Sequence, residues 1–216
     1  MIRDALPLLM KGSVMTLQIA LLSFIMSLVI GTVCGILTCR HLKIRGISEC
    51  IEGVTFVLRA IPFFVQLLLM YFVIPDVLKI DMTAVTASII SLGLCSSGYM
   101  TQIIKSGLDA VPVSQWELTF SLGYTTYQSL RFGIFPQAFL SVLPNLNNEL
   151  ESLLKSTAIV SSIGVLELTR MGMNIVSREM EPVPIYLTVA LFYTVMSLMI
   201  KCLSLFLERR FFYVKS

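Results

Sequence analysis

The feature that most constrains the fold of this chain is a series of apolar segments, each long enough to cross a lipid bilayer. A membrane-spanning helix needs about 20 mostly apolar residues. The clearest segment covers residues 14–37, and four others follow at 56–77, 83–104, 135–154 and 184–207. Only 13% of the residues are charged, whereas soluble domains carry about 25%. We therefore predict an all-α integral membrane protein with five transmembrane helices.

The distribution of basic residues predicts which helix ends face the cytosol. With the N-terminus outside, the inner side holds the larger group: Arg40, Lys43, Arg45, Arg59, Lys105, Arg131, Arg209, Arg210 and Lys215. The outer side holds a smaller group: Arg3, Lys11, Lys79, Lys155, Arg170 and Arg178. This excess follows the positive-inside rule. We therefore predict one transmembrane domain over residues 1–216, with the N-terminus outside and the C-terminus inside.

Several classes of function are disfavoured by the residues that carry chemistry. The five cysteines form no CxxC pair and are expected to act as small apolar side chains rather than metal ligands: Cys34, Cys39, Cys50, Cys95 and Cys202. The lone histidine, His41, is expected to be a solvated loop residue. The net charge of +3 is scattered, which argues against nucleic-acid binding. Because no Walker pattern and no nucleophile–base pair occurs, we expect neither ATP binding nor enzymatic activity in this chain.

A punctuated amphipathic segment lies between the apolar runs at about residues 105–135. Pro112 and Gly123 predict two short helices with a bend between them. Large apolar side chains recur here, and an exposed loop of this kind usually docks on a partner: Trp116, Leu118, Phe120, Leu122 and Tyr127. On the predicted topology the segment is cytoplasmic. Few basic residues flank it, which disfavours a helix lying on the lipid surface.

The same segment resembles a known family. Glu117, Gly123 and Pro136 have the spacing of the EAA loop of bacterial ABC importer permeases, whose pattern is Glu-Ala-Ala, three residues, Gly, nine residues and Ile-x-Leu-Pro. The chain departs from that pattern at four positions: Leu118, Thr119, Gly133 and Phe135. Further runs are similar to the polar amino acid branch of these permeases (the histidine, glutamate, glutamine, arginine and opine type): KGSVMTL, RAIPFFVQLLLMYF, SGYMTQIIKSGLDAVPVSQWE and NELESLLKSTAIVSSIGVLELTR.

This resemblance implies the type I permease fold of ABC importers in the bacterial inner membrane. It implies a pair of permease protomers, of identical or homologous chains, each docked through its loop on a separate ATP-binding subunit. That subunit would bind and hydrolyse ATP with Mg²⁺, and an extracytoplasmic binding protein would deliver an amino acid. No cofactor is expected in this chain itself. The residues assigned to ATPase coupling are Glu117, Leu118, Thr119, Gly123 and Pro136.

Polar residues crowd the fourth apolar segment and its continuation. Ionisable residues at membrane depth are costly and usually face a cavity or each other. The residues assigned to a substrate path are Gln66, Glu149, Lys155, Ser156 and Thr157. Glu151 and Lys155, four residues apart, are expected to form a buried pair. Each of these side chains could instead only lock helix packing, and Gln66 could form an interhelical hydrogen bond.

Two further features bear on the substrate. Pro62 is expected to kink the second segment and free backbone groups that could meet an amino acid. Family members that take cationic substrates often have aspartate where this chain has Ser156, which weakens the case for a basic substrate without excluding one. A Glu151–Lys155 pair would neutralise itself and leave the cavity nearly uncharged, which favours a polar zwitterion. The leading hypothesis is thus the permease of an amino acid importer that works by alternating access. The alternative is a membrane scaffold or sensor whose loop docks a cytosolic protein without transporting solute.

Overall fold

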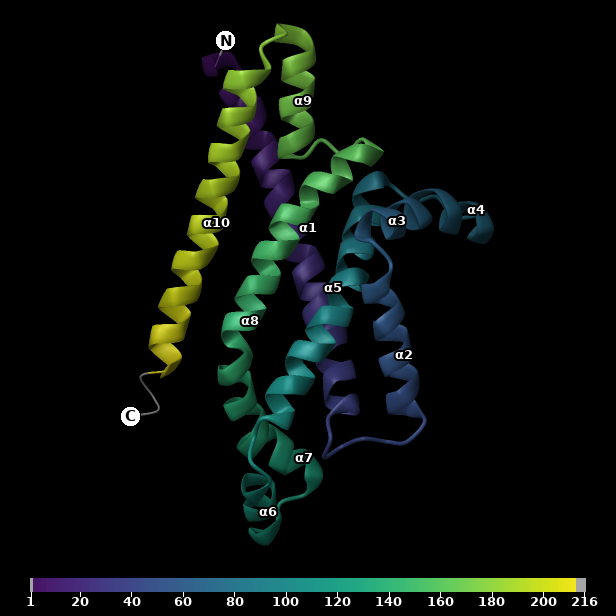
Figure 1. Ribbon diagram of the computed structural model, residues 1–216, viewed down its shortest axis with the longest axis vertical. Helices are drawn as coiled ribbons and strands as arrows, with labels where there is room; N and C mark the ends of the chain where they lie inside the picture. The colour runs from purple at the N-terminus through teal and green to yellow at the C-terminus, as the bar shows by residue number, and fades with distance from the viewer. Residues whose placement is uncertain (1, 213–216) are drawn as a thin grey trace.

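A computed structural model describes residues 2–212, which form helices joined by short connections (Figure 1). The elements in chain order are α1 (Ile2–Thr38), α2 (Ile47–Ala60), α3 (Phe63–Leu68), the π-helical η1 (Leu69–Val73), α4 (Ile74–Leu78), α5 (Ala84–Asp109), α6 (Val113–Ser121), α7 (Thr126–Gln128), the π-helical η2 (Ser129–Ile134), α8 (Phe135–Ser156), the 3₁₀ segment η3 (Thr157–Ile163), α9 (Leu168–Glu179) and α10 (Pro182–Phe212).

The prediction of an all-helical chain is confirmed for the described residues. Three helices, α1, α5 and α10, are long and apolar enough to cross a membrane, and up to five spans result if each of two bent helix pairs is one span. A bilayer favours this architecture because a helix satisfies its backbone hydrogen bonds internally. The exact count of five spans stays a prediction.

Helices α1 and α5 form the centre of the bundle, crossing along most of their length (Figure 1). Their approach is close, because a Cβ added to Gly31 would lie 2.5 Å from Met100 Cβ, and one added to Gly35 would lie 2.8 Å from Ile104 Cβ. Small residues permit such contact between helices in lipid. Helix α8 packs on the same core and brings its polar residues beside α5.

The second apolar segment is broken, as Pro62 predicts. Helix α2 ends at Ala60 and α3 begins at Phe63. The chain bends by 100° between the helical segments Ile47–Ala60 and Phe63–Leu78. Proline has no N–H and disfavours helical backbone in the residue before it, and Ile61 is extended with ψ 128°. The segment predicted as one helix over 56–77 is therefore two helical arms, and α3 to α4 point away from the bundle (Figure 1).

The connections between helices lie at two opposite ends of the bundle, and the sequence predicts the same division. The lower end in Figure 1 carries the connection from α1 to α2 together with α6 and α7, whereas α9 and the start of α1 lie at the upper end. Which end faces the cytosol stays a prediction. Lys215, counted in that prediction, lies outside the described residues.

Helix α9 is an element that the sequence analysis missed. Glu167 caps its N-terminus by accepting hydrogen bonds from the backbone N–H groups of Thr169 (2.9 Å) and Arg170 (2.7 Å). The Tyr193 hydroxyl of α10 donates to the same carboxylate at 3.0 Å, and the Leu168 N–H donates to Thr16 Oγ1 of α1 at 3.1 Å. These bonds fix α9 against both long helices at the upper end.

Candidate functional site

The amphipathic segment folds as predicted into two short helices separated by a glycine bend. Helix α6 follows Pro112 and ends at Ser121, and Thr125 begins α7 with a reciprocal cap in which its hydroxyl accepts from the Gln128 N–H. Gly123 lies between them with φ +79°, a conformation that glycine adopts without strain. Among the described residues no atom lies within 4 Å of a Cβ added there, so only the backbone angle requires glycine.

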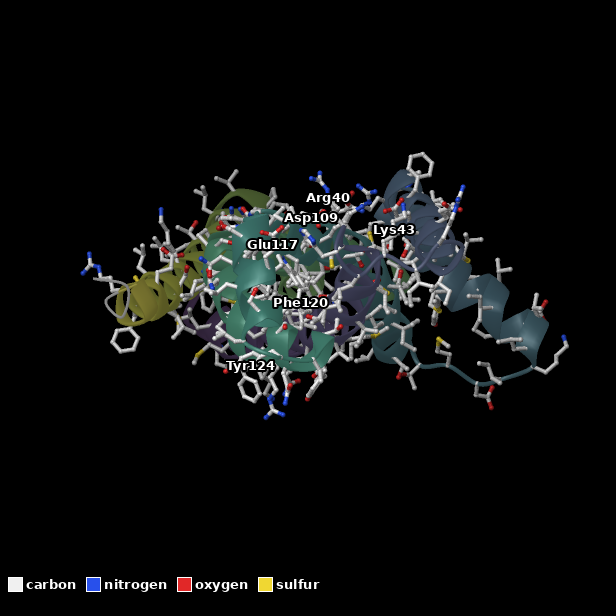
Figure 2. All side chains as sticks on the ribbon, turned by 90° about the horizontal axis from the view of Figure 1, so that it is seen from below. Arg40, Lys43, Asp109, Glu117, Phe120 and Tyr124 are labelled. Carbon is white, nitrogen blue, oxygen red and sulfur yellow. The ribbon has the colours of Figure 1, made fainter. Side chains whose placement is uncertain are left out.

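The outward face of α6 and α7 is apolar. Leu118 and Leu122 are 52% and 65% exposed, and Phe120 and Tyr127 are exposed as well. Glu117 is also exposed, and Figure 2 shows it with Phe120 at the lower end of the molecule. The expectation that Trp116 adds to this surface is wrong, because its side chain is 2% exposed and packs inward on Ile104, Leu108 and their neighbours.

Thr119 and Pro136, the remaining residues assigned to coupling, have different surroundings. Thr119 is buried and its hydroxyl donates to the Trp116 carbonyl at 2.8 Å, so its side chain faces the body of the protein. Pro136 is exposed in the first turn of α8, directly after η2. Of the five residues assigned to coupling, Thr119 alone is buried, and the other four are exposed.

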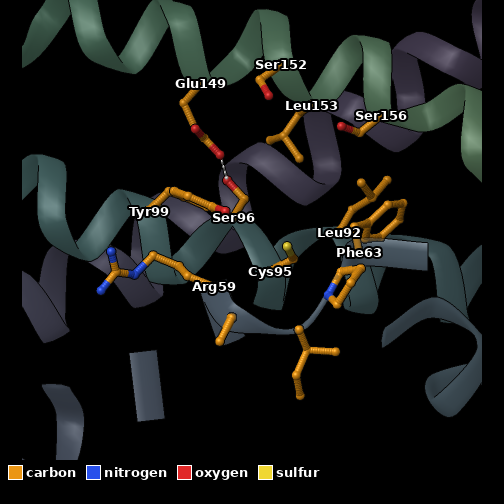
Figure 3. A pocket seen from close by; sticks show the side chains of 13 residues that line it. Arg59, Phe63, Leu92, Cys95, Ser96, Tyr99, Glu149, Ser152, Leu153 and Ser156 are labelled. Carbon is orange, nitrogen blue, oxygen red and sulfur yellow. Dashed lines mark hydrogen bonds between the residues drawn. The ribbon is translucent and has the colours of Figure 1, made fainter. Parts of the chain in front are cut away.

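A cavity of about 420 Å³ lies where the α2–α3 break meets α5 and α8 (Figure 3). The break contributes Arg59, Ala60, Ile61, Pro62 and Phe63; α5 contributes Leu92, Cys95, Ser96 and Tyr99; and α8 contributes Glu149, Ser152, Leu153 and Ser156. The kink at Pro62 thus supplies one wall, because it turns the chain from α2 into α3 at this point.

The cavity has a charged side and an apolar side. Figure 3 shows Arg59, Tyr99 and Glu149 toward one side, with Phe63 and Leu92 toward the other. The Ser96 hydroxyl donates to Glu149 Oε1 at 2.6 Å, and Arg59 Nε donates to the Thr55 carbonyl at 3.2 Å. Arg59 and Glu149 therefore both line this cavity, and the apolar side chains of Phe63 and Leu92 line it away from them.

The substrate-path residues proposed from the sequence divide into two groups. Glu149 and Ser156 line the cavity. Gln66 is 9% exposed and its Nε2 donates to the carbonyls of Leu58 (2.7 Å) and Ile61 (2.8 Å), so it braces the α2–α3 break. Thr157 is fully buried, and its hydroxyl donates to the carbonyl of Leu154 at 2.7 Å.

The pairing of Glu151 with Lys155 is confirmed, with an Nζ–Oε1 distance of 2.7 Å. The expectation that the pair is buried is wrong for this chain, since the Lys155 and Glu151 side chains are 63% and 33% exposed. The pair lies outside the cavity lining. Lys155 therefore lies beside its helical partner and does not line this cavity, and its assignment to the substrate path stays a prediction.

Sequence reasoning missed the α5 wall of the cavity and the stacking of His41 on Trp116. Ser96 and Tyr99 sit in a run of small residues that the sequence indicated only as a packing face. His41 is not a free loop residue: its ring stacks on Trp116, with centroids 4.8 Å apart and an interplanar angle of 23°. No local pattern signals either contact, because both depend on residues distant in the sequence.

Comparison with known proteins identifies relatives along nearly the whole chain. Residues 27–213 match the family described as "Binding-protein-dependent transport system inner membrane component". The Escherichia coli (strain K12) "Glutamine transport system permease protein GlnP" is 30% identical, with 95% of this chain and 94% of the relative covered. The Bacillus subtilis (strain 168) "Probable amino-acid permease protein YxeN" is also 30% identical, with 95% and 92% covered.

Solved structures agree in fold. A structure described as an amino acid ABC transporter with histidines superposes with a TM-score of 0.87 at 33% identity, and 97% of this chain and 96% of that chain are covered. An inward-facing MetNI methionine ABC transporter superposes with a TM-score of 0.83 at 19% identity, covering 95% and 97%. At that identity the second likeness bears on the fold alone.

Proposed function

Because the chain belongs to the family of binding-protein-dependent transport system inner membrane components, we propose that it is the membrane-spanning subunit of an ATP-driven amino acid importer. The observation that carries the substrate class is the cavity that presents Arg59 and Glu149 together. Its volume of about 420 Å³ lies in the range of small-molecule sites, about 300–1,000 Å³. The names of the relatives, which refer to amino acid and glutamine transport, support the same class.

The charges of the cavity match a zwitterion. The guanidinium of Arg59 can bind the α-carboxylate of an amino acid, and the Glu149 carboxylate can accept from its α-ammonium group, both through charge-assisted hydrogen bonds. Ser96, Ser152 and Ser156 add hydroxyl groups to the lining. The apolar wall at Phe63 and Leu92 is then left for the substrate side chain. A neutral amino acid leaves no charge unpaired in this arrangement.

Transport in this proposal is driven through the lower end of the molecule. The exposed apolar face of α6 and α7 docks a separate ATP-binding subunit, since a contiguous exposed apolar patch usually marks a protein contact. Hydrolysis of ATP with Mg²⁺ belongs to that partner. Closure of two such subunits under a permease pair would rock the helices and switch access to the cavity, a rigid-body transition. An extracytoplasmic binding protein delivers the substrate.

The test is uptake by the whole complex in lipid vesicles. The permease is reconstituted with its ATP-binding subunit and its binding protein, and labelled glutamine accumulation is measured with and without ATP, beside labelled lysine and glutamate. The proposal predicts ATP-dependent accumulation that requires the binding protein and is greatest for the neutral substrate. A complex that assembles but moves none of the three amino acids would instead support a scaffold or sensor.

A further inference from the structure

The connection between α1 and α2, residues 39–46, is attached to the corner between α5 and α6. The Arg40 backbone N–H donates to Asp109 Oδ1 at 2.7 Å, and Asp109 is the last residue of α5. Figure 2 shows these two residues side by side at the lower end. One residue further, the His41 ring stacks on Trp116 of α6 at a centroid distance of 4.8 Å. The α1–α2 connection therefore holds the end of α5 through Arg40 and holds α6 through His41.

Trp116 is the part of α6 that enters the body of the protein. It is 2% exposed and belongs to the same buried cluster as Cys39 of the α1–α2 connection and Ile134 of η2. Its Nε1 atom is buried and has no hydrogen-bond partner among the described residues. Ring packing is therefore what positions this indole, and His41 supplies the stacked face. A displacement of α6 must move Trp116, and Trp116 bears directly on His41.

The α1–α2 connection is in turn fixed to α2. The Ser48 hydroxyl donates to the Leu37 carbonyl at 2.6 Å and accepts from the Ile44 N–H at 3.0 Å. Ser48 is fully buried. Higher on α2, Glu52 pairs with Lys105 of α5 at 2.6 Å. The start of α2 therefore moves with the connection, whereas a flexible loop would absorb the displacement.

The C-terminal end of α2 forms one wall of the cavity. Arg59 and Ala60 end this helix, and Ile61 and Pro62 form the break that follows. A helix is a rigid element, and coupling between distant sites passes through such packed elements. The contacts from Trp116 through His41 and along α2 thus form a continuous path from the exposed α6 surface to the cationic side of the cavity.

We propose that His41 is a positioning residue that acts through Trp116, transmitting the displacement of α6 into the α1–α2 connection and along α2 to the Arg59 side of the cavity. The proposal rests on the importer function proposed above. His41 itself touches neither the substrate nor the docked ATP-binding subunit in this scheme. Its loss therefore separates ATP hydrolysis from solute movement, rather than abolishing either assembly or hydrolysis.

The test compares variants of the complete complex in vesicles, by yield, ATP hydrolysis and uptake. His41→Ala removes the stacked ring, and His41→Phe restores a flat aromatic ring. Lys43→Ala is the matched control, because Lys43 lies exposed in the same connection. We expect the His41→Ala complex to assemble and to hydrolyse ATP. The amount of amino acid transported per ATP should fall about fivefold, a factor that corresponds to the free energy of one lost aromatic pair. His41→Phe should return that ratio to within about twofold, and Lys43→Ala should leave it unchanged.

An unchanged ratio in His41→Ala, or no recovery in an assembled His41→Phe complex, would overturn the proposal. If the His41→Ala complex fails to assemble, Asp109→Ala is the second variant to measure. It removes the carboxylate that accepts from the Arg40 N–H and so weakens the attachment of the same α1–α2 connection. It is expected to lower the ratio in an assembled complex, and an unchanged ratio there would also overturn the proposal. Failure of the importer function differs from both outcomes, since the unmodified complex would then show no ATP-dependent uptake.

Discussion

Thr119 occupies the space that a side chain at residue 133 would need, because a Cβ added to Gly133 would lie 2.7 Å from Thr119 Cγ2. These are two of the positions at which the chain departs from the EAA pattern, where alanine and isoleucine are usual. The larger residue on α6 and the smaller one in η2 therefore compensate for each other. The pair keeps α6 packed on η2 although neither residue follows the pattern.

This relationship predicts a coupled pair of substitutions. Gly133→Val should destabilise the protein by about 1–3 kcal/mol, as overpacking does, because Thr119 is buried and its hydroxyl is bonded to the Trp116 carbonyl. Adding Thr119→Ala should recover most of the loss. Thermal unfolding of the purified permease in detergent, run as a double-mutant cycle, measures the coupling. Additive effects of the two changes would show that the contact does not constrain the packing of α6.

Gly123 predicts a local effect on docking. A β-branched residue at φ +79° is strained, at a cost of about 1–2 kcal/mol or more, so Gly123→Val should distort the bend between α6 and α7. We expect the variant to insert normally and to lose co-purification with the ATP-binding subunit. Gly53→Val is the control, because an added Cβ there also meets no described atom within 4 Å and the backbone is helical. Equal co-purification of both variants would contradict the docking role of the bend.

Gln66 predicts an effect on stability rather than on substrate contact. Gln66→Leu leaves the Leu58 and Ile61 carbonyls without their donor, and a buried unsatisfied group costs about 1–3 kcal/mol. The unfolding midpoint should fall by about 2–4 °C for each kcal/mol lost. Gln137→Leu should change it little, since Gln137 is exposed and its side-chain amide donates to the Gly133 carbonyl of the adjoining turn. A normal midpoint with reduced uptake for Gln66→Leu would instead return Gln66 to the substrate path.

Two native cysteines test the orientation of the lower end. Cys50 is exposed near the start of α2, whereas Cys39 is fully buried and burial raises the pKa of its thiol. The thiolate is the reactive form, so at neutral pH Cys39 should react far more slowly. In variants that keep one cysteine each, a membrane-impermeant maleimide should label Cys50 from the cytosolic side only. Labelling of Cys50 from outside only would reverse the predicted topology.

The parts of the fold that the sequence predicts are those set by local chemistry. Apolar length places the long helices, Pro62 breaks the second segment, and Gly123 forms the bend that its spacing indicates. The cavity was predicted in part, because Glu149 and Ser156 belong to the polar residues that crowd the fourth apolar segment and its continuation. Ser96 could not be recognised, since a serine in a span is ordinary until its partner is known. The stacking of His41 on Trp116 likewise joins residues 75 positions apart (116 − 41).

The most direct test of the central claim is amino acid uptake by the Glu149→Gln complex. Removing the carboxylate weakens a charge-assisted bond to the substrate ammonium by about 1.5–3 kcal/mol, so initial uptake at low substrate concentration should fall at least about tenfold. Glu151→Gln, two residues along the same helix and outside the cavity lining, should retain near-normal uptake. Loss of uptake in Glu149→Gln with retention in Glu151→Gln is the predicted result. Equal uptake by both variants would contradict the assignment of this cavity to the substrate.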